Sequence, residues 1–268
     1  MASKNIVFKH IRNAIGKILF NGITLLVDPL LAPKGEYPGF DIANTLERKL
    51  MRNPLVELPK PVEKILKDID AVIITHTHLD HWDPFAAKVI PKHIPVFVQH
   101  AADKKLLVDQ GFQDVRVVGI NTPFKGITIT KTGGQHGSDM MFSIPTFAEA
   151  AGESMGFVLK APEQKIVYFA GDTVWHEYFE LAVKKHKPDV IVLNTGEAKF
   201  DGLEGSLIMG TEDVKKCYDL SKNAKIITVH MDAINHCVCT REIMNKFVSE
   251  NKLNDRVLVP KDGEVLNL

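Results

Sequence analysis

The sequence predicts a mixed α/β fold in which two packed β-sheets are covered by helices. The first thirty residues form short runs with β character, whereas helical and strand-like segments alternate from residue 61 onward. A β-rich beginning followed by mixed units favours two packed sheets over one doubly wound sheet. The chain has 268 residues and is 45% hydrophobic, which is enough to bury the core of one large domain. We therefore expect a single domain over residues 1–268.

The amino-terminal part is predicted to contain three strands followed by an irregular excursion. The strands are expected at residues 6–11, 17–20 and 23–27, and Asn21-Gly22 between the last two is a strong signal for a tight hairpin turn. Residues 29–60 are rich in Pro and Gly and contain one expected helix, at 43–51. We interpret this excursion as an ordered surface segment or lid near a functional site.

Helices and strands alternate regularly from residue 61. The wholly apolar run at 71–74 is typical of a strand covered on both faces. Asp83-Pro84 predicts a helix start, with Asp as the N-cap and Pro at the first helical position. Further helices are expected at 62–67, 101–110, 176–187 and 240–250, and another helix is expected to be capped by Thr211. Further strands are expected at 95–99, 115–118, 126–131, 155–160, 165–170, 190–193, 226–229 and 256–259.

Charge and cysteine content restrict the classes of partner. The 33 Lys and Arg residues balance 33 Asp and Glu residues, so the chain lacks the basic excess of a nucleic-acid or membrane-surface binder. No apolar run reaches the length of a membrane helix, and the first residues lack the apolar region of a signal peptide. Cys217, Cys237 and Cys239 are a sparse, odd set for an oxidising compartment. We expect a cytoplasmic protein that binds neither a membrane nor a long nucleic acid and acts on a small molecule.

The segment after the buried strand at 71–74 carries four side chains that can bind a cation, in the pattern H-x-H-x-D-H. Imidazole nitrogen and carboxylate oxygen suit zinc, manganese or iron. Alternate placement puts His76 and His78 on one side of an extended chain, and Asp80 and His81 then turn toward a second point. The pattern is much more specific than a lone glycine motif. It favours a metal site over a polar turn with solvated histidines.

Three further candidate ligands, His136, Asp172 and His230, each lie just past a predicted strand. Glycines beside His136 and Asp172 allow the backbone to approach a site closely. Each residue is a weak signal alone, and the joint pattern indicates the site. His230 and His236 compete for the last ligand position, and the strand-end position favours His230. His236 is then a candidate for substrate contact or leaving-group protonation, with a surface histidine as the alternative.

In this order of motifs the sequence resembles the metallo-β-lactamase superfamily of metal-dependent hydrolases, over roughly residues 6–260. The resemblance implies a four-layer αββα sandwich with two divalent metal ions at one edge of the sheets, zinc being expected before manganese or iron. It also implies a ligand set: His76, His78 and His136 for one ion, Asp80, His81 and His230 for the other, and Asp172 as the bridge.

A two-metal site predicts hydrolysis. Two cations about 3.5 to 4 Å apart share a water, lower its pKa and stabilise charge that develops at a carbonyl or phosphoryl centre. We expect a metal-bridged hydroxide to cleave an ester, lactone or phosphodiester bond of a small anionic substrate, with Asp80 and His236 as catalytic residues. Arg12, Lys34, Arg48, Lys199 and Arg241 are candidates for contact with the anion, with a solvated surface position as the default interpretation of each. The continuation H-W-D after the motif resembles the branch that contains L-ascorbate-6-phosphate lactonase.

Two other functions remain open at this point. The first is a nuclease or cyclic-nucleotide phosphodiesterase, which neutral overall charge disfavours for long nucleic acids but not for a mononucleotide. The second is a metal-binding protein without turnover. Structural zinc sites are usually closed and cysteine-rich, whereas this ligand set needs no cysteine. The pair Cys237 and Cys239, without a second pair, is a poor zinc motif.

Overall fold

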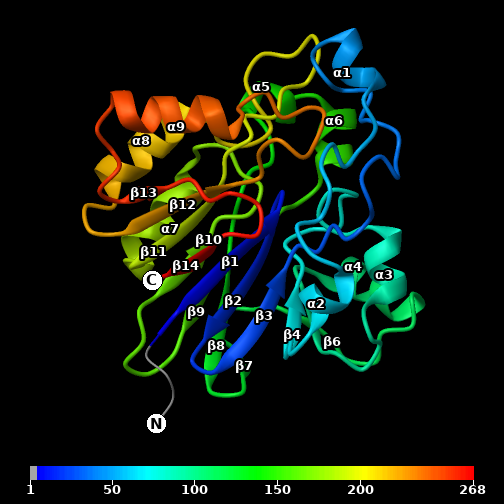
Figure 1. The fold of residues 1–268 in the computed structure, drawn as a ribbon, viewed down its shortest axis with the longest axis vertical. Helices are drawn as coiled ribbons and strands as arrows, with labels where there is room; N and C mark the ends of the chain where they lie inside the picture. The colour runs from blue at the N-terminus through cyan, green and yellow to red at the C-terminus, as the bar shows by residue number, and fades with distance from the viewer. Residues whose placement is uncertain (1–4) are drawn as a thin grey trace.

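The computed structural model describes residues 5–268 as two seven-stranded mixed sheets that pack face to face, with helices on both outer faces (Figure 1). This arrangement confirms the predicted αββα sandwich. The first sheet has the order β14 (Val265–Asn267), β1 (Val7–Arg12), β2 (Ile15–Phe20), β3 (Ile23–Val27), β4 (Ala71–Ile73), β5 (Val96–Val98), β6 (Val115–Val117). The second has the order β13 (Val257–Leu258), β12 (Lys225–Val229), β11 (Val190–Asn194), β10 (Val167–Phe169), β9 (Gly156–Lys160), β8 (Ile127–Thr132), β7 (Thr122–Phe124).

The helices cover the two outer faces and one end of the sandwich (Figure 1). One side carries α2 (Val62–Leu66), α3 (Pro84–Val89) and α4 (Ala101–Asp109), and the other carries α7 (Glu177–His186), α8 (Thr211–Leu220) and α9 (Arg241–Glu250). At the top end in this view lie α1 (Leu46–Leu50), α5 (Asp139–Phe142) and α6 (Pro145–Ala151).

Both sheets contain a parallel half, and this topology decides where a site can form. Strands β3 to β6 run parallel in the first sheet, and β10 to β13 run parallel in the second. Parallel strands end at the same edge of a sheet, so the loops that follow them lie side by side. The loops after β4, β10 and β12 carry six of the seven predicted metal ligands. The seventh, His136, follows β8, which runs in the same direction as β10 because both strands are antiparallel to β9.

Three apolar clusters separate the four layers. Strand β4 shows how the sequence builds them, because its side chains alternate between the two faces of the sheet. Ala71 and Ile73 pack into the core between the sheets, and Val72 and Ile74 pack against the helices outside. All four are fully buried, as predicted for a strand covered on both faces. Burying one such aliphatic side chain contributes about 1.5–3 kcal/mol.

Two local sequence signals have the structural effect predicted for them. Asn21 and Gly22 both have positive φ, 51° and 79°, and form the tight turn that pairs β2 with β3. The Asp83 side chain accepts a hydrogen bond from the Ala86 amide and caps α3, whose first residue is Pro84. The polypeptide therefore turns directly from the H-x-H-x-D-H segment into a helix.

The excursion at 29–60 is fixed to the sandwich by Arg12. This guanidinium is 0% exposed and donates to the carbonyls of Leu30 and Ala32 at 2.7 and 2.9 Å and of Val56 at 2.9 Å. A charged group buried among carbonyls holds those backbone segments in place. The expectation that Arg12 contacts an anionic substrate is therefore wrong, because its donors are committed to the backbone.

Several predicted boundaries differ from the structure, and four short elements were not predicted. The helix expected at 43–51 is limited to α1 and capped by Thr45, and the cap of α8 is Gly210 rather than Thr211. The unpredicted elements are β7, β14, α5 and α6. Strand β7 contains Pro123, which lacks the amide that a strand pattern requires, and lies at the sheet edge. Strand β14 is a three-residue edge strand, too short to show a period.

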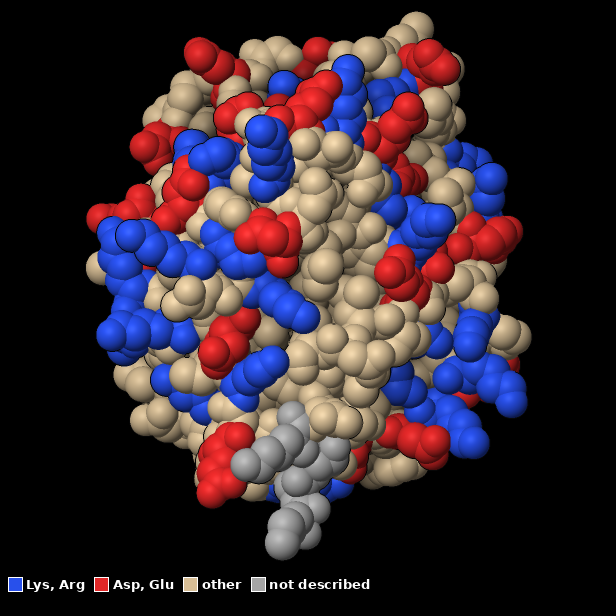
Figure 2. Space-filling model, turned by 60° about the vertical axis from the view of Figure 1, so that its left-hand side comes forward, with Lys and Arg blue, Asp and Glu red and all other residues tan. Residues whose placement is uncertain are grey.

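The surface carries charges of both signs. Figure 2 shows Lys and Arg side chains interspersed with Asp and Glu over one face, with uncharged surface between them. In residues 5–268 no helix combines the length and apolarity needed to cross a membrane.

Candidate metal centre

The structure brings all seven predicted metal ligands together, six of them after the parallel strands β4, β10 and β12 and His136 after β8. Their ligand atoms form three overlapping groups, each with all atoms within 4.8 Å of one another. The groups are His76, His78 and His136; His76, His81 and Asp172; and Asp80, His81 and His230. The first and the third group contain the residues that the resemblance implied as ligands of two separate ions.

Asp172 lies between these two groups. Its Oδ2 is 3.2 Å from His81 Nε2, 3.5 Å from His136 Nε2 and 3.8 Å from His230 Nε2. It is also 4.0 Å from His76 Nε2. One carboxylate oxygen thus faces ligand nitrogens from both groups, which is the position that a bridging carboxylate requires.

The donor set fits divalent cations. Five imidazoles and two carboxylates converge, and of these residues only His78 is more than slightly exposed. His76 Nε2 is buried and has no hydrogen-bond partner among the described residues, whereas its Nδ1 lies 3.1 Å from Thr75 Oγ1. A buried polar atom without a partner is costly unless something binds it. A neutral imidazole nitrogen directed at carboxylates is a suitable ligand for zinc, manganese or iron.

The charges of the cluster also suit a cation. Burial raises the pKa of Asp172, but the imidazoles of His81 and His230 outweigh burial and hold it well below its ordinary value. Burial lowers the pKa of His81, but neighbouring carboxylates, Asp172 first, raise it to about 10. For His76, burial and then the charge of His81 keep the pKa well below its ordinary value. The carboxylates therefore stay ionised, and His76 keeps a lone pair for a metal. His81 holds a proton between the carboxylates, and a metal ion that binds its Nε2 displaces this proton.

Asp28, which directly follows β3, contacts residues at both ends of the H-x-H-x-D-H segment. Its Oδ2 lies 3.0 Å from His81 Nδ1 and accepts from Thr75 Oγ1 at 2.8 Å, and its Oδ1 accepts from the Thr75 amide at 2.7 Å. A carboxylate can only accept, so the Nδ1–H of His81 donates and Nε2 is left for a metal. This role was not predicted from the sequence. The available signal was a polar residue just past an apolar strand, followed by Pro29.

Other ligands are oriented in the same way. Asn194 Nδ2 donates to Asp172 Oδ1 at 2.6 Å, which leaves Oδ2 facing the imidazoles. His136 Nδ1 donates to the Leu207 carbonyl at 3.0 Å. His230 Nδ1 lies 3.5 Å from Cys237 Sγ. These contacts fix each ring with one nitrogen toward the cluster. Cys237 thus lies beside the predicted ligand His230, and neither Cys237 nor Cys239 belongs to the three ligand groups among the described residues.

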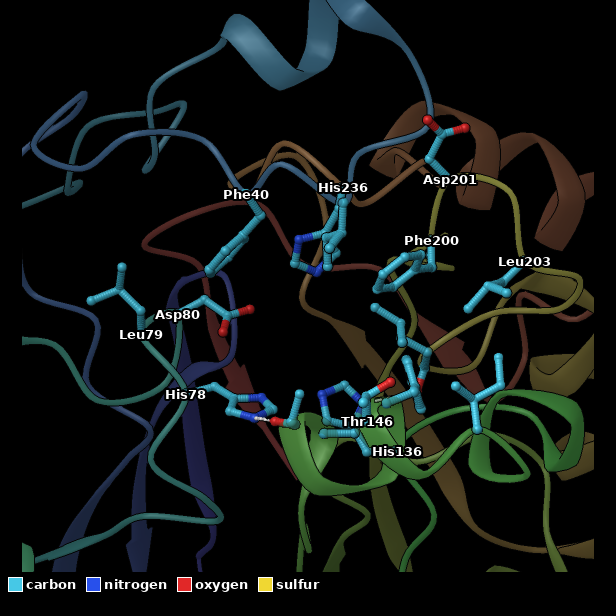
Figure 3. Close-up of a pocket in the computed structure, with 16 residues that line it drawn as sticks. Phe40, His78, Leu79, Asp80, His136, Thr146, Phe200, Asp201, Leu203 and His236 are labelled. Carbon is cyan, nitrogen blue, oxygen red and sulfur yellow. Dashed lines mark hydrogen bonds between the residues drawn. The ribbon is translucent and has the colours of Figure 1, made fainter.

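A cavity of about 480 Å³ opens beside the metal ligands (Figure 3). His78, Asp80 and His136 form its polar side, and most of the remaining wall is apolar. The other lining residues are Phe40, Ile42, Leu79, Ile144, Thr146, Phe147, Ala150, Ala151, Phe200, Asp201, Leu203, Leu207 and His236. Neither Lys nor Arg is among these lining residues of the described chain, so none of the five basic candidates lines the cavity.

His236 lies in this cavity and belongs to none of the three ligand groups among the described residues, whereas His230 does. Its side chain is directed into the space between Phe40 and Phe200 (Figure 3). The residue is 6% exposed, and its ring centroid lies 5.0 Å from that of Phe40. Burial lowers the pKa of His236 to about 4, against the opposing charge of Asp80. The imidazole is therefore neutral at neutral pH and can donate a hydrogen bond.

Known proteins resemble this chain over nearly its whole length. The chain is 42% identical over 255 residues to the UPF0173 protein YddR of Bacillus subtilis, and the match covers 95% of this chain and 97% of that protein. It is 26% identical over 230 residues to the UPF0173 metal-dependent hydrolase MJ1163 of Methanocaldococcus jannaschii, covering 85% of this chain and 96% of that protein.

Two solved structures superpose closely. A possible metal-dependent hydrolase from Veillonella parvula has a TM-score of 0.95 and 45% identity, covering 98% of this chain and 99% of that chain. An isothiocyanate hydrolase from Delia radicum gut bacteria has a TM-score of 0.93 and 38% identity, with the same coverage.

The family model of the beta-lactamase superfamily domain matches residues 24–231, which is more than half of the chain and includes all seven predicted ligands. This chain therefore belongs to the beta-lactamase superfamily and is a metal-dependent hydrolase of the metallo-β-lactamase fold.

Proposed function

We propose that this protein hydrolyses apolar isothiocyanates in a reaction that depends on two divalent metal ions. The apolar cavity beside the metal ligands is the observation that carries the proposal. An isothiocyanate is uncharged, and its organic group needs apolar contacts rather than cationic ones. A solved structure 38% identical to this chain is described as an isothiocyanate hydrolase and superposes with a TM-score of 0.93.

The reaction needs only water as co-reactant. The oxygen of water bonds to the central carbon of R–N=C=S, and one proton of that water moves to nitrogen, which gives the thiocarbamic acid. The C–N bond then breaks, the remaining proton moves to nitrogen, and the products are R–NH₂ and O=C=S. The carbon is electrophilic like a carbonyl carbon, so the metal chemistry predicted for an ester applies here.

The residues of the cavity can perform distinct parts of this reaction. When bound, the metal ions supply water that is activated at neutral pH. The carboxylate of Asp80 accepts a hydrogen bond from the attacking water and orients it. His236, across the cavity, donates a hydrogen bond to the substrate nitrogen and passes protons to it. Phe40 and Phe200 contact the organic group and exclude water.

The alternatives from sequence fit this cavity less well. Bound metal ions could contact the reacting group of an anionic ester, lactone or phosphodiester, but the described lining contains neither Lys nor Arg to bind a further anionic group of such a substrate. The same observation disfavours a nuclease or a cyclic-nucleotide phosphodiesterase. A closed, non-catalytic metal site would have no adjoining substrate cavity. We also propose a cytoplasmic location, because the three cysteines are free and buried.

The test compares substrate classes with one preparation of metal-loaded protein. Benzyl isothiocyanate, an uncharged lactone, a phosphorylated lactone and bis(4-nitrophenyl) phosphate are supplied in turn, and product formation is followed in each case. We expect benzylamine and carbonyl sulfide in equal amounts from the first compound, at a rate far above that of the other three. Turnover of a lactone or the phosphodiester without isothiocyanate turnover would contradict the proposal.

The control must account for spontaneous reaction of isothiocyanates with protein amines and thiols. The His78→Ala variant keeps every Lys and Cys of the chain but lacks one metal ligand. Its rate therefore reports the spontaneous reaction, and we expect it to release no benzylamine above that of a protein-free sample.

A further inference from the structure

Asn235 connects the loop that carries His236 to the excursion at 29–60. The residue is 0% exposed, and its side chain makes four hydrogen bonds, all to the excursion. Its Oδ1 accepts from the Phe40 amide at 3.0 Å and from Asn53 Nδ2 at 2.9 Å. Its Nδ2 donates to the carbonyls of Phe40 and Arg48, both at 2.9 Å. The hydrogen-bonding capacity of the amide is fully used, so this contact has one geometry.

Arg48, which belongs to the excursion, donates hydrogen bonds to the loop that carries His236. Its Nε donates to the Asn235 carbonyl at 2.7 Å, and a terminal guanidinium nitrogen donates to the Cys237 carbonyl. These two carbonyls flank His236 in sequence. A planar guanidinium fixes two acceptors at once, which an ammonium group cannot reproduce.

We infer that Arg48 and Asn235 form a clamp that positions His236 against Phe40 in the substrate cavity. The Asn235 amide holds the backbone of Phe40 at both its N–H and its C=O, and Arg48 holds the backbone on both sides of His236. The apolar wall and the hydrogen-bonding imidazole therefore form one unit, although almost two hundred residues separate them. Arg48 and Asn235 touch no substrate, and both act as positioning residues. This inference rests on the proposed function, in which His236 contacts the substrate.

Arg52 provides a matched control in the same excursion. Its Nε donates to the Gly35 carbonyl at 2.7 Å and its terminal nitrogen donates to the Glu36 carbonyl at 2.8 Å. It has the same charge and the same kind of backbone contact as Arg48, but its acceptors lie within the excursion. Comparison of Arg48→Ala with Arg52→Ala separates loss of the clamp from general loosening of the segment.

The first test is a double-mutant cycle with benzyl isothiocyanate as substrate. Misplacing a catalytic group by about 1 Å can cost up to about 100-fold in rate. We expect Arg48→Ala to lower kcat about tenfold or more and Arg52→Ala to change it less than about twofold. In a His236→Ala background, Arg48→Ala should cause less than about a twofold further loss, since residues that act through one group are not additive. Equal losses in both backgrounds would overturn the clamp.

The second test does not depend on the substrate. Hydrogen exchange is measured on metal-loaded protein, with attention to the peptide that spans 233–239. We expect faster exchange there in Arg48→Ala, an intermediate rate in Arg48→Lys, and no change in Arg52→Ala. Unchanged exchange in Arg48→Ala would overturn the clamp whatever the substrate is. Absence of isothiocyanate turnover in the unsubstituted protein would instead contradict the proposed function, and hydrogen exchange would then decide alone whether the clamp exists.

Discussion

Asp28 controls the orientation of a metal ligand without lying in the cavity. Its carboxylate faces His81 Nδ1 and both hydrogen-bond donors of Thr75, so it fixes the start and the end of the H-x-H-x-D-H segment. An amide in its place would direct an N–H at a donor. Asp28 is the partner of His81 Nδ1, and this contact bridges 53 residues of sequence.

We predict that Asp28→Asn weakens metal binding about 10- to 100-fold, as loss of a ligand's outer partner typically does. The measurement is the metal retained in competition with a chelator. Asp70→Asn is the control, because Asp70 accepts from the Thr24 amide at the opposite end of the same strands. If both variants retain metal equally, Asp28 does not orient His81.

The convergence of the seven candidate ligands could be predicted because they lie in short motifs and at strand ends, both of which are local properties of the sequence. Their supporting residues could not. Asn194 and Asp172 are 22 residues apart, and His136 and Leu207 are 71 apart. Such pairs exist only after the strands have found their register. The predictions for Arg12 and Arg48 failed for the same reason, because a basic residue that binds distant carbonyls has the same local sequence as a solvated one.

The loop between the elements β11 and α8 contributes the aromatic side chain of Phe200 to the cavity wall. The Phe200 ring lies 5.8 Å from that of Phe147 on α6, and both residues line the cavity. The loop is joined to the excursion where the Asp201 amide donates to the Ile42 carbonyl at 2.9 Å and where Lys49 Nζ lies 2.9 Å from the Asp201 carboxylate. Phe200, Phe147 and the excursion thus bring three separate segments of sequence together at this part of the cavity wall.

We predict that Phe200→Ala raises KM for benzyl isothiocyanate about tenfold and changes kcat much less. The ring contacts the organic group equally before and during reaction, which is uniform binding, and losing such a contact costs about 1–2 kcal/mol. Methyl isothiocyanate, which has no ring to contact, should show little change. Steady-state kinetics with both substrates provides the measurement.

Phe142→Ala is the matched control for this substitution. Phe142 packs on Phe147 at 5.8 Å between centroids but does not line the cavity. A rise in KM equal to that of Phe200→Ala would mean that the effect comes from packing of α5 and α6 rather than from contact with the substrate.

Elements with a clear period were predicted, whereas α5 and α6 were not, although Ser138 caps α5 and Pro145 is the first residue of α6. The strand at 71–74 and the helix start at Asp83-Pro84 needed no tertiary information. Helices α5 and α6 are short and irregularly patterned, and they form where Met141 and Phe147 pack into the core beside the first sheet. Packing of this kind overrides weak local preference, so these helices are products of the fold rather than of local sequence.

The fold of the whole chain buries all three of its thiols. Cys217, Cys237 and Cys239 are all buried, and burial raises the pKa of Cys217 and Cys239 to about 12. The thiolate is the reactive form, so high pKa and burial both slow reaction with an isothiocyanate.

We predict that no cysteine of the folded protein is modified during turnover of excess benzyl isothiocyanate. Intact-mass measurement after reaction, with cysteine-containing peptides identified by digestion, checks this outcome. In denaturant, all three cysteines should react with a thiol reagent. Modification of Cys237 or Cys239 in the folded protein within a few turnovers would contradict their burial.

Each sheet has an antiparallel part and a parallel part. Six of the seven predicted metal ligands follow the parallel strands β4, β10 and β12, and His136 follows β8 in the antiparallel part of the second sheet. We propose that the seven predicted ligands form one metal centre on which hydrolysis depends. The most direct measurement is metal bound per chain together with benzyl isothiocyanate turnover, during zinc titration of chelator-treated protein. We predict that turnover rises with bound metal until about two ions are bound, and that a His76→Ala/His78→Ala variant binds less metal and shows no turnover. Full turnover in metal-free protein, or metal binding unchanged by the double substitution, would contradict this claim.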